Sequence, residues 1–261
     1  MVNLLLEEKG RIGIIKINRP KVKNALNKES LLELRNAIRA YRKNKKIRAI
    51  LITGIDNSFS AGMDLKSVQG LTSEKVQWVA SLGRLVLLEI NNGIEYEIDP
   101  VEFFEQVLKG HEIKYEIGEN WKPIIAAING YALGGGLELA CACDFRFASK
   151  NATLGYPEID LRIFPSWGGT QFTTKILGIP KSEYLIFTCE RIDSNKAREI
   201  GLINDVFNDA DLFNKSFEFA RKLTKKDLNI LKNVKILIEQ SFGNNLIKGL
   251  ALEYKFTKNW K

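Results

Sequence analysis

The sequence predicts an α/β protein, in which buried strands alternate with helices. The chain has 261 residues, of which 45% are hydrophobic and 27% are charged, as in ordinary globular proteins. This length supports one sizeable core, or at most two small domains. The first fifty residues follow the order strand, strand, helix, strand, which implies a crossover connection. The last strand of this run, at residues 47–53, and a later buried strand at residues 124–129 each lead into a glycine-rich loop.

The first half of the chain supplies the clearest elements. Residues 4–8 and 11–18 are short and apolar-rich, which predicts two strands, and Arg19-Pro20 ends the second. Residues 28–45 carry an apolar stripe at helical spacing, with Asn27 as the N-cap. Residues 47–53 are continuously apolar, as expected for a strand covered on both faces.

The rest of the chain is mostly helical. Further strands are expected at residues 124–129, 145–148 and 153–155. Helices are expected at residues 75–90, 100–109, 137–142, 170–177, 181–188, 194–200, 209–223, 226–241 and 246–258.

Cysteine and histidine are too scarce for several kinds of chemistry. The chain has three cysteines and a single histidine, which cannot assemble an ordinary Cys/His zinc site from distant pairs. One histidine also disfavours a Ser-His-Asp or Cys-His mechanism. We therefore expect no metal, reduced cysteines, and acid–base chemistry carried by carboxylates.

The remaining composition bears on location and partners. No apolar run reaches the roughly 18 residues that span a bilayer, and the N-terminus does not read as a signal peptide, so we expect a cytoplasmic protein without a membrane segment. The formal net charge of +8 favours anionic partners such as nucleic acid, a membrane surface or phosphorylated small molecules.

Two glycine-rich loops are the first candidates for a site. Residues 59–66 (FSAGMDLK) and 132–140 (ALGGGLELA) each follow a strand, and the second opens a helix. Glycine lets backbone N–H groups approach a ligand closely, and a helix N-terminus adds partial positive charge. Two such loops could direct donors at one developing oxyanion. The alternative is that the glycines only permit tight turns and close packing.

Two glutamates are the candidates for acid–base work. Glu138 falls in the first turn of the helix that the second loop opens, where we expect a lowered pKa. Glu158 has largely apolar neighbours, where we expect a raised pKa. Groups with separated pKa values can act as an acid and a base. The alternative is that each is an ordinary surface glutamate.

Taken together, these motifs resemble the crotonase, or enoyl-CoA hydratase/isomerase, family. The resemblance covers roughly residues 10–205, in the family's order. It rests on INRP with NAL, FSAGMDLK, PIIAAINGYALGGGLELACACDFRFA, PE, GGTQ and AREIGLI.

The resemblance implies a spiral of ββα units over residues 1–200. A C-terminal helical region, residues 201–261, would build a homotrimer or a hexamer. It also implies an acyl-CoA substrate and no cofactor beyond the CoA that the substrate carries. The family's oxyanion hole maps onto the backbone N–H groups of Met63 and Gly135.

Both glutamate positions of the hydratase branch are filled, by Glu138 and Glu158, whereas isomerases commonly lack one of them. This favours hydration of a 2-enoyl-CoA to a 3-hydroxyacyl-CoA. Glu158 is expected to donate the proton, and Glu138 to position and deprotonate the water.

The same mapping gives the residues that contact CoA or the acyl group. They are Lys23, Ala25, Ala61, Asp64, Leu65, Lys66, Gly134 and Trp167. Lysines suit phosphates as point charges, although a solvated surface cation is the alternative for each. Trp167 stands where the family usually has a small residue. Its ring could shorten the acyl pocket or stack on an aromatic acyl group, or it could simply pack.

The chain departs from the family in two further places. Residues 67–122 are longer than the usual spacing, and they carry the only histidine. The chain also ends at Lys261, where most relatives continue with another helical segment, so we expect a reduced lid and oligomer contact.

Two alternative functions follow from the sequence. One is another crotonase reaction: double-bond isomerisation, thioester hydrolysis or dehalogenation. The other is RNA binding through a basic strip formed by Arg35, Arg39, Arg42 and Lys46 on the first helix. Nucleic acid is not the favoured partner, because this helix has no interleaved aromatic residues for base stacking.

Overall fold

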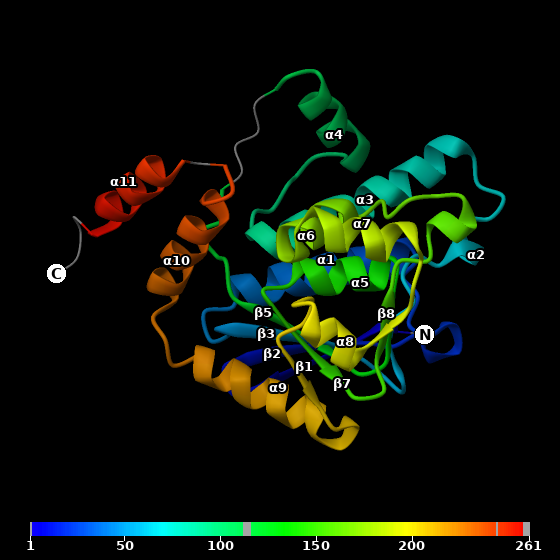
Figure 1. Cartoon of the computed structure of the whole chain (residues 1–261), viewed down its shortest axis with the longest axis horizontal. Helices are drawn as coiled ribbons and strands as arrows, with labels where there is room; N and C mark the ends of the chain where they lie inside the picture. Colours follow the sequence, from blue (N-terminus) through cyan, green and yellow to red (C-terminus); the bar gives the residue numbers. More distant parts are fainter. Residues whose placement is uncertain (1, 112–115, 244, 258–261) are drawn as a thin grey trace.

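A computed structural model describes residues 2–111, 116–243 and 245–257, and it contains two sheets (Figure 1). In the larger sheet β1 runs antiparallel to β2 and the other neighbours are parallel. Its order is β1 (Leu4–Lys9), β2 (Ile12–Ile17), β3 (Ala49–Gly54), β5 (Ile124–Ile128), β7 (Phe145–Ser149), β10 (Asp205–Phe207). The smaller sheet has the order β4 (Ser58–Ser60), β6 (Tyr131–Leu133), β8 (Thr153–Gly155), β9 (Ile192–Asp193).

The chain moves between the two sheets in a repeating pattern. Three times, a strand of the larger sheet is followed by a strand of the smaller sheet and then by a helix. The units are β3, β4, α2 (Leu65–Val68) and α3 (Ser73–Asn92); β5, β6 and α5 (Gly135–Ala142); and β7, β8 and α6 (Gly169–Leu177). The predicted spiral of ββα units is therefore confirmed.

Helices cover both faces of the larger sheet, which explains its continuously apolar strands. All six residues of β3 are buried. The helix α1 (Lys28–Lys43) lies on one face and α9 (Asp209–Leu223) on the other (Figure 1). As predicted, Asn27 caps α1, and its side chain accepts the Ser30 N–H at 2.9 Å. The helix ends two residues earlier than expected.

The part that stands apart from the sheets is shorter than predicted. Residues 205–207 pair with β7 and α9 packs on β3, β5 and β7, so both belong to the core. After α9 the chain continues as α10 (Leu228–Gln240) and α11 (Leu246–Thr257), which extend to one side (Figure 1). The predicted boundary at residue 200 thus lies before β10 and α9, which pack on the larger sheet, and the arm formed by α10 and α11 follows them. The predicted helix position Lys258 lies outside the described residues.

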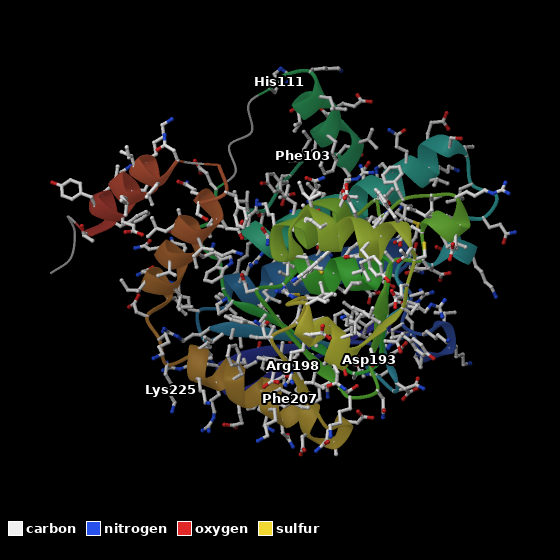
Figure 2. The ribbon with its side chains drawn as sticks, in the orientation of Figure 1. Phe103, His111, Asp193, Arg198, Phe207 and Lys225 are labelled. Atoms are coloured by element: carbon white, nitrogen blue, oxygen red, sulfur yellow. The ribbon has the colours of Figure 1, made fainter. Side chains whose placement is uncertain are left out.

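The other helices are α4 (Pro100–Leu108), α7 (Ile179–Phe187) and α8 (Ser194–Glu199). In the ranges given above, the structure contains no helix long and apolar enough to cross a membrane. His111 follows α4 at the outer end of the molecule (Figure 2).

The prediction that a basic strip on α1 could bind phosphates is wrong. Arg35 and Arg39 donate to the buried carboxylate of Glu89 on α3, at 2.8 and 2.6 Å. Arg42 is only 3% exposed and donates to backbone carbonyls at the end of α3. Three of the four cations thus join α1 to α3 and cannot contact phosphates, so the RNA-binding alternative loses its basis.

Candidate active site

A pocket lies where the loop after β4, the start of α5 and the segment after β8 meet. It contains eight of the twelve predicted site residues. Its lining residues are Ala61, Met63, Leu65, Gly134, Gly135, Glu138, Pro157, Glu158, Leu161, Ile163, Phe164, Ser166 and Trp167.

The two predicted oxyanion donors lie side by side in this pocket. A Cβ on Gly135 would be 3.3 Å from the Met63 nitrogen. Gly62 has a φ of +87°, and a Cβ there would come within 2.7 Å of the Gly135 nitrogen, so only glycine allows this approach. The Met63 N–H and the Gly135 N–H donate to no protein acceptor within the described ranges. Two backbone donors are therefore available to one ligand oxygen.

The position of Met63 is fixed by its neighbours in the chain. The Leu26 N–H donates to the Gly62 carbonyl at 2.7 Å, and the Asp64 N–H donates to the Leu26 carbonyl at 2.9 Å. Gly135 is the first residue of α5, so its N–H group has no partner inside the helix. The partial positive charge of that helix end favours an oxyanion at the same point.

Glu138 lies on α5 and is only 2% exposed. Its Oε1 accepts the Trp167 N–H at 2.8 Å and the Gly169 N–H at 2.7 Å. Burial nevertheless raises the pKa of Glu138 to about 8, with a further rise from the charge of Glu158. The expected lowering of this pKa is wrong, because the loss of water around the carboxylate outweighs the helix terminus and the two donors.

Glu158 lies in the segment after β8, facing the start of α5. A Cβ on Gly134 would be 2.7 Å from its Oε1. Its Oε2 is buried and has no hydrogen-bond partner among the described residues. Burial raises the pKa of Glu158 to about 7, in the direction that its apolar neighbours predict. Both carboxyl groups therefore titrate near neutral pH.

Trp167 both lines the pocket and packs in the core. It is 1% exposed, and a Cβ on Gly135 would lie 2.6 Å from its ring. The aromatic ring thus lies directly against the backbone of the second oxyanion donor. The sequence offers several roles for Trp167, and the structure combines two of them: the ring packs in the core and also bounds the pocket.

Four predicted residues lie outside the pocket lining. Asp64 is 8% exposed and pairs with Arg19 at 2.9 Å, and the Ala25 carbonyl accepts from the same guanidinium. These two residues support the loop that carries Met63. Lys23 and Lys66 are exposed. The Lys23 Nζ lies 4.4 Å from the centroid of the Tyr131 ring.

Sequence reasoning missed the groups that hold Glu138 in place. The Trp167 and Gly169 N–H groups are backbone donors, which no residue type signals. It also missed Arg84, whose Nε donates to the Ser166 carbonyl at 2.6 Å. A single cation inside the apolar run SLGRLVLLEI was the available signal. The long segment 67–122 contributes no residue to the pocket lining in its described part.

The described residues include no group of three or more His, Cys, Asp or Glu side chains placed to hold a metal ion.

The sequence model of the enoyl-CoA hydratase/isomerase family matches residues 7–89 and 106–260. The chain belongs to this family. The unmatched residues 90–105 fall in the segment that the sequence predicts to be longer than usual. The four residues that the sequence resemblance assigns to the oxyanion hole and the glutamate pair, Met63, Gly135, Glu138 and Glu158, all line this pocket.

Individual relatives cover nearly the whole chain. A crotonyl-CoA hydratase from Syntrophomonas wolfei is 32% identical over 96% of this chain and 86% of its own length. A short-chain-enoyl-CoA hydratase from Clostridium acetobutylicum is 33% identical with the same coverage. The crystal structure of an enoyl-CoA hydratase from Bacillus anthracis superposes with a TM-score of 0.84 at 30% identity, covering 97% of this chain and 89% of that one.

Proposed function

We propose that this protein hydrates a short 2-enoyl-CoA to the 3-hydroxyacyl-CoA, using Glu138, Glu158 and the N–H groups of Met63 and Gly135. The observation that carries the proposal is the meeting of two buried carboxyl groups and two free backbone donors in one pocket. The relatives named above, a crotonyl-CoA hydratase and a short-chain-enoyl-CoA hydratase, support both the reaction and the substrate class.

In the reaction, the thioester oxygen accepts hydrogen bonds from Met63 and Gly135. This polarisation makes the β-carbon electrophilic. Glu138 takes a proton from the water, whose oxygen forms the new bond to the β-carbon. Negative charge moves to the thioester oxygen, where the two donors stabilise it. Glu158 then gives its proton to the α-carbon, and exchange with solvent returns each carboxyl group to its starting state.

The number of protons on the two carboxyl groups suits the reaction, but the order of their pKa values places the resting proton on Glu138. Hydration therefore starts from the less populated arrangement, in which Glu158 carries the proton. With pKa values near 8 and 7, the pair of carboxyl groups holds about one proton between those pH values. A reaction that removes one proton and supplies another needs one acid and one base. The buried Oε2 of Glu158, which has no partner in the described ranges, is a donor atom suited to substrate.

We also propose self-association into a trimer or a hexamer in the cytoplasm. The arm formed by α10 and α11 presents a row of largely exposed apolar side chains, which a partner subunit would cover. These are Ile230, Val234, Ile238, Phe242, Leu246, Ile247, Leu250 and Tyr254.

The test replaces each glutamate by glutamine, which keeps the volume and removes the titrating group. Glu138→Gln and Glu158→Gln should each lower the rate of crotonyl-CoA hydration by about 10²–10⁴-fold. Binding of acyl-CoA should persist, because the oxyanion donors are backbone groups. The double variant should lose far less than the product of the single losses, since the two groups act together.

The matched control is Glu183→Gln on α7, an exposed glutamate outside the pocket, which should hydrate at the wild-type rate. Hydration is followed by loss of the enoyl chromophore, and the products are identified by mass. Wild-type hydration by Glu158→Gln would refute its role as the proton donor. Double-bond migration as the main activity, with only Glu158 required, would replace hydration by isomerisation.

A further inference from the structure

Two consecutive residues of α3, Gly83 and Arg84, contact two consecutive residues of the segment between β8 and α6, Trp167 and Ser166. Gly83 faces the Trp167 ring so closely that a Cβ there would lie 2.3 Å from it. The next residue, Arg84, donates from Nε to the Ser166 carbonyl at 2.6 Å. The Trp167 ring is therefore held between Gly83 on α3 and Gly135 on α5.

One peptide group connects Arg84 to Glu138. The Ser166 carbonyl and the Trp167 N–H belong to the same peptide unit, and in a trans peptide they point to opposite sides. Arg84 binds the carbonyl, and the Glu138 Oε1 accepts the N–H at 2.8 Å. A cation on the carbonyl polarises the peptide group and strengthens its N–H as a donor. The arginine thus acts on Glu138 without contacting it.

Arg84 has no competing ion pair in the described part of the chain. Its other side-chain contacts are weak: Nη1 donates to the Ser81 hydroxyl at 3.4 Å, and the guanidinium lies 5.3 Å from the centroid of the Phe104 ring on α4. The hydrogen bond to the Ser166 carbonyl is its shortest contact. The long segment before β5 thereby gains a role, since α4 places an aromatic ring against Arg84.

We propose that Arg84 is a positioning residue for the hydration reaction: it orients the Ser166–Trp167 peptide group so that the Trp167 N–H holds the Glu138 carboxylate where it can take a proton from the attacking water. This inference rests on the function proposed above. Arg84 is absent from the pocket lining, so it is not expected to contact substrate.

Arg84 differs in charge from the other titratable groups that face Glu138. The titratable groups that face Glu138 are Arg84 from α3, Cys141 from its own helix, Tyr156 from the end of β8, and Glu158. Arg84 is the single cation in this set. Its charge lowers the pKa of Glu138, against the larger rise caused by burial. Loss of the cation should leave Glu138 protonated to a higher pH, where it cannot act as a base.

The test is a series of three variants that separate charge from hydrogen bonding. Arg84→Lys keeps a charge and a donor, Arg84→Gln keeps a donor only, and Arg84→Met keeps neither. We expect Arg84→Met to lower kcat by about 10- to 100-fold, the cost typical of removing a group that orients a reactive ligand, with KM changed less than about threefold. Arg84→Lys should recover most of kcat. The basic limb of kcat/KM, which follows the higher pKa of Glu138, should move to higher pH in Arg84→Gln and Arg84→Met and stay in place in Arg84→Lys.

The control is Arg198→Met on α8, which removes an exposed arginine outside the pocket lining and should leave kcat unchanged (Figure 2). A second readout does not depend on turnover. The Glu138 carboxyl carbon is titrated by ¹³C NMR in glutamate-labelled protein, with Glu138→Gln assigning the signal, and its pKa should rise in Arg84→Met.

The two readouts keep the outcomes distinct. An unchanged Glu138 titration in folded Arg84→Met would overturn the inference, whatever the enzyme's activity. A rise in KM at constant kcat would also overturn it, because that result would assign Arg84 to substrate binding. If the wild type failed to hydrate any enoyl-CoA, the proposed function would fall and the titration would still decide the link between Arg84 and Glu138.

Discussion

Replacement of Trp167 should change which acyl chains the enzyme accepts. Its ring bounds the pocket and is 1% exposed, so a smaller side chain opens space directly beside the oxyanion donors. Each methylene that enters this space gains about 0.8 kcal/mol of burial, or roughly fourfold in kcat/KM. A chain longer by two methylenes should therefore gain about 15-fold over crotonyl-CoA.

The choice of substitution follows from the cost of the cavity. Trp→Ala in a core loses about 3–5 kcal/mol, a large part of the 5–15 kcal/mol that stabilises a typical protein. Trp167→Leu fills part of the space and is the better variant. Its kcat/KM is measured for C4, C6 and C8 enoyl-CoA substrates after circular dichroism shows native structure.

The control for this experiment is Trp121→Leu, which removes a tryptophan that is 6% exposed and outside the pocket lining. It should lose stability and keep the wild-type ratio of C6 to C4 activity. The same ratio in folded Trp167→Leu would refute the reasoning and leave Trp167 with a packing role only.

Three further outcomes are expected. Gly135→Pro should lose about 100-fold or more in kcat, because it removes an oxyanion donor, whereas Gly135→Ala measures the steric contact with the nearby ring alone; equal losses would contradict the donor role. The pH profile of kcat/KM should be a narrow bell with limbs near 7 and 8, since both carboxyl groups are protonated below this range and neither is protonated above it; a flat profile from pH 5 to 10 would disagree. The Tm of Glu138→Gln, relative to wild type, should be higher at pH 9 than at pH 5. The pKa of Glu138 is raised in the folded state, so its contribution to folding stability is present at low pH and is lost as the pH rises through about 8. An equal Tm difference at both pH values would argue against burial of the charge.

The sequence predicts the longer strands, the three-residue strand at 153–155 and the residues that motifs identify. The strand at residues 49–54 is signalled by a continuous apolar run, because it is buried on both faces. The strands at residues 58–60, 131–133, 192–193 and 205–207 were missed, because two or three residues carry no periodicity and their pairing partners are distant in sequence.

Long-range contacts also explain two wrong predictions about charged groups: the basic strip on α1 and the lowered pKa of Glu138. The arginines of α1 look like a solvent-facing strip until Glu89, some fifty residues later, folds against them. Glu138 has a helix-start position that suggests a low pKa, but its burial depends on the segment that carries Trp167. Arg84 belongs to no motif, and its partner is a backbone carbonyl 82 residues away. Such pairings arise from tertiary structure, which local spacing does not encode.

The pocket cannot form from any single local stretch of the chain. One donor follows β4 and the other opens α5, the second carboxyl group follows β8, and α3 holds the segment before α6 from outside. Each of these contacts closes a long loop of chain, whose entropy must be lost before the site has any geometry. A nascent chain should therefore have no activity until residues through α6 have emerged and folded. For the same reason, turnover should vanish together with the sheets on heating, so a simple activity assay reports the folding of the whole spiral.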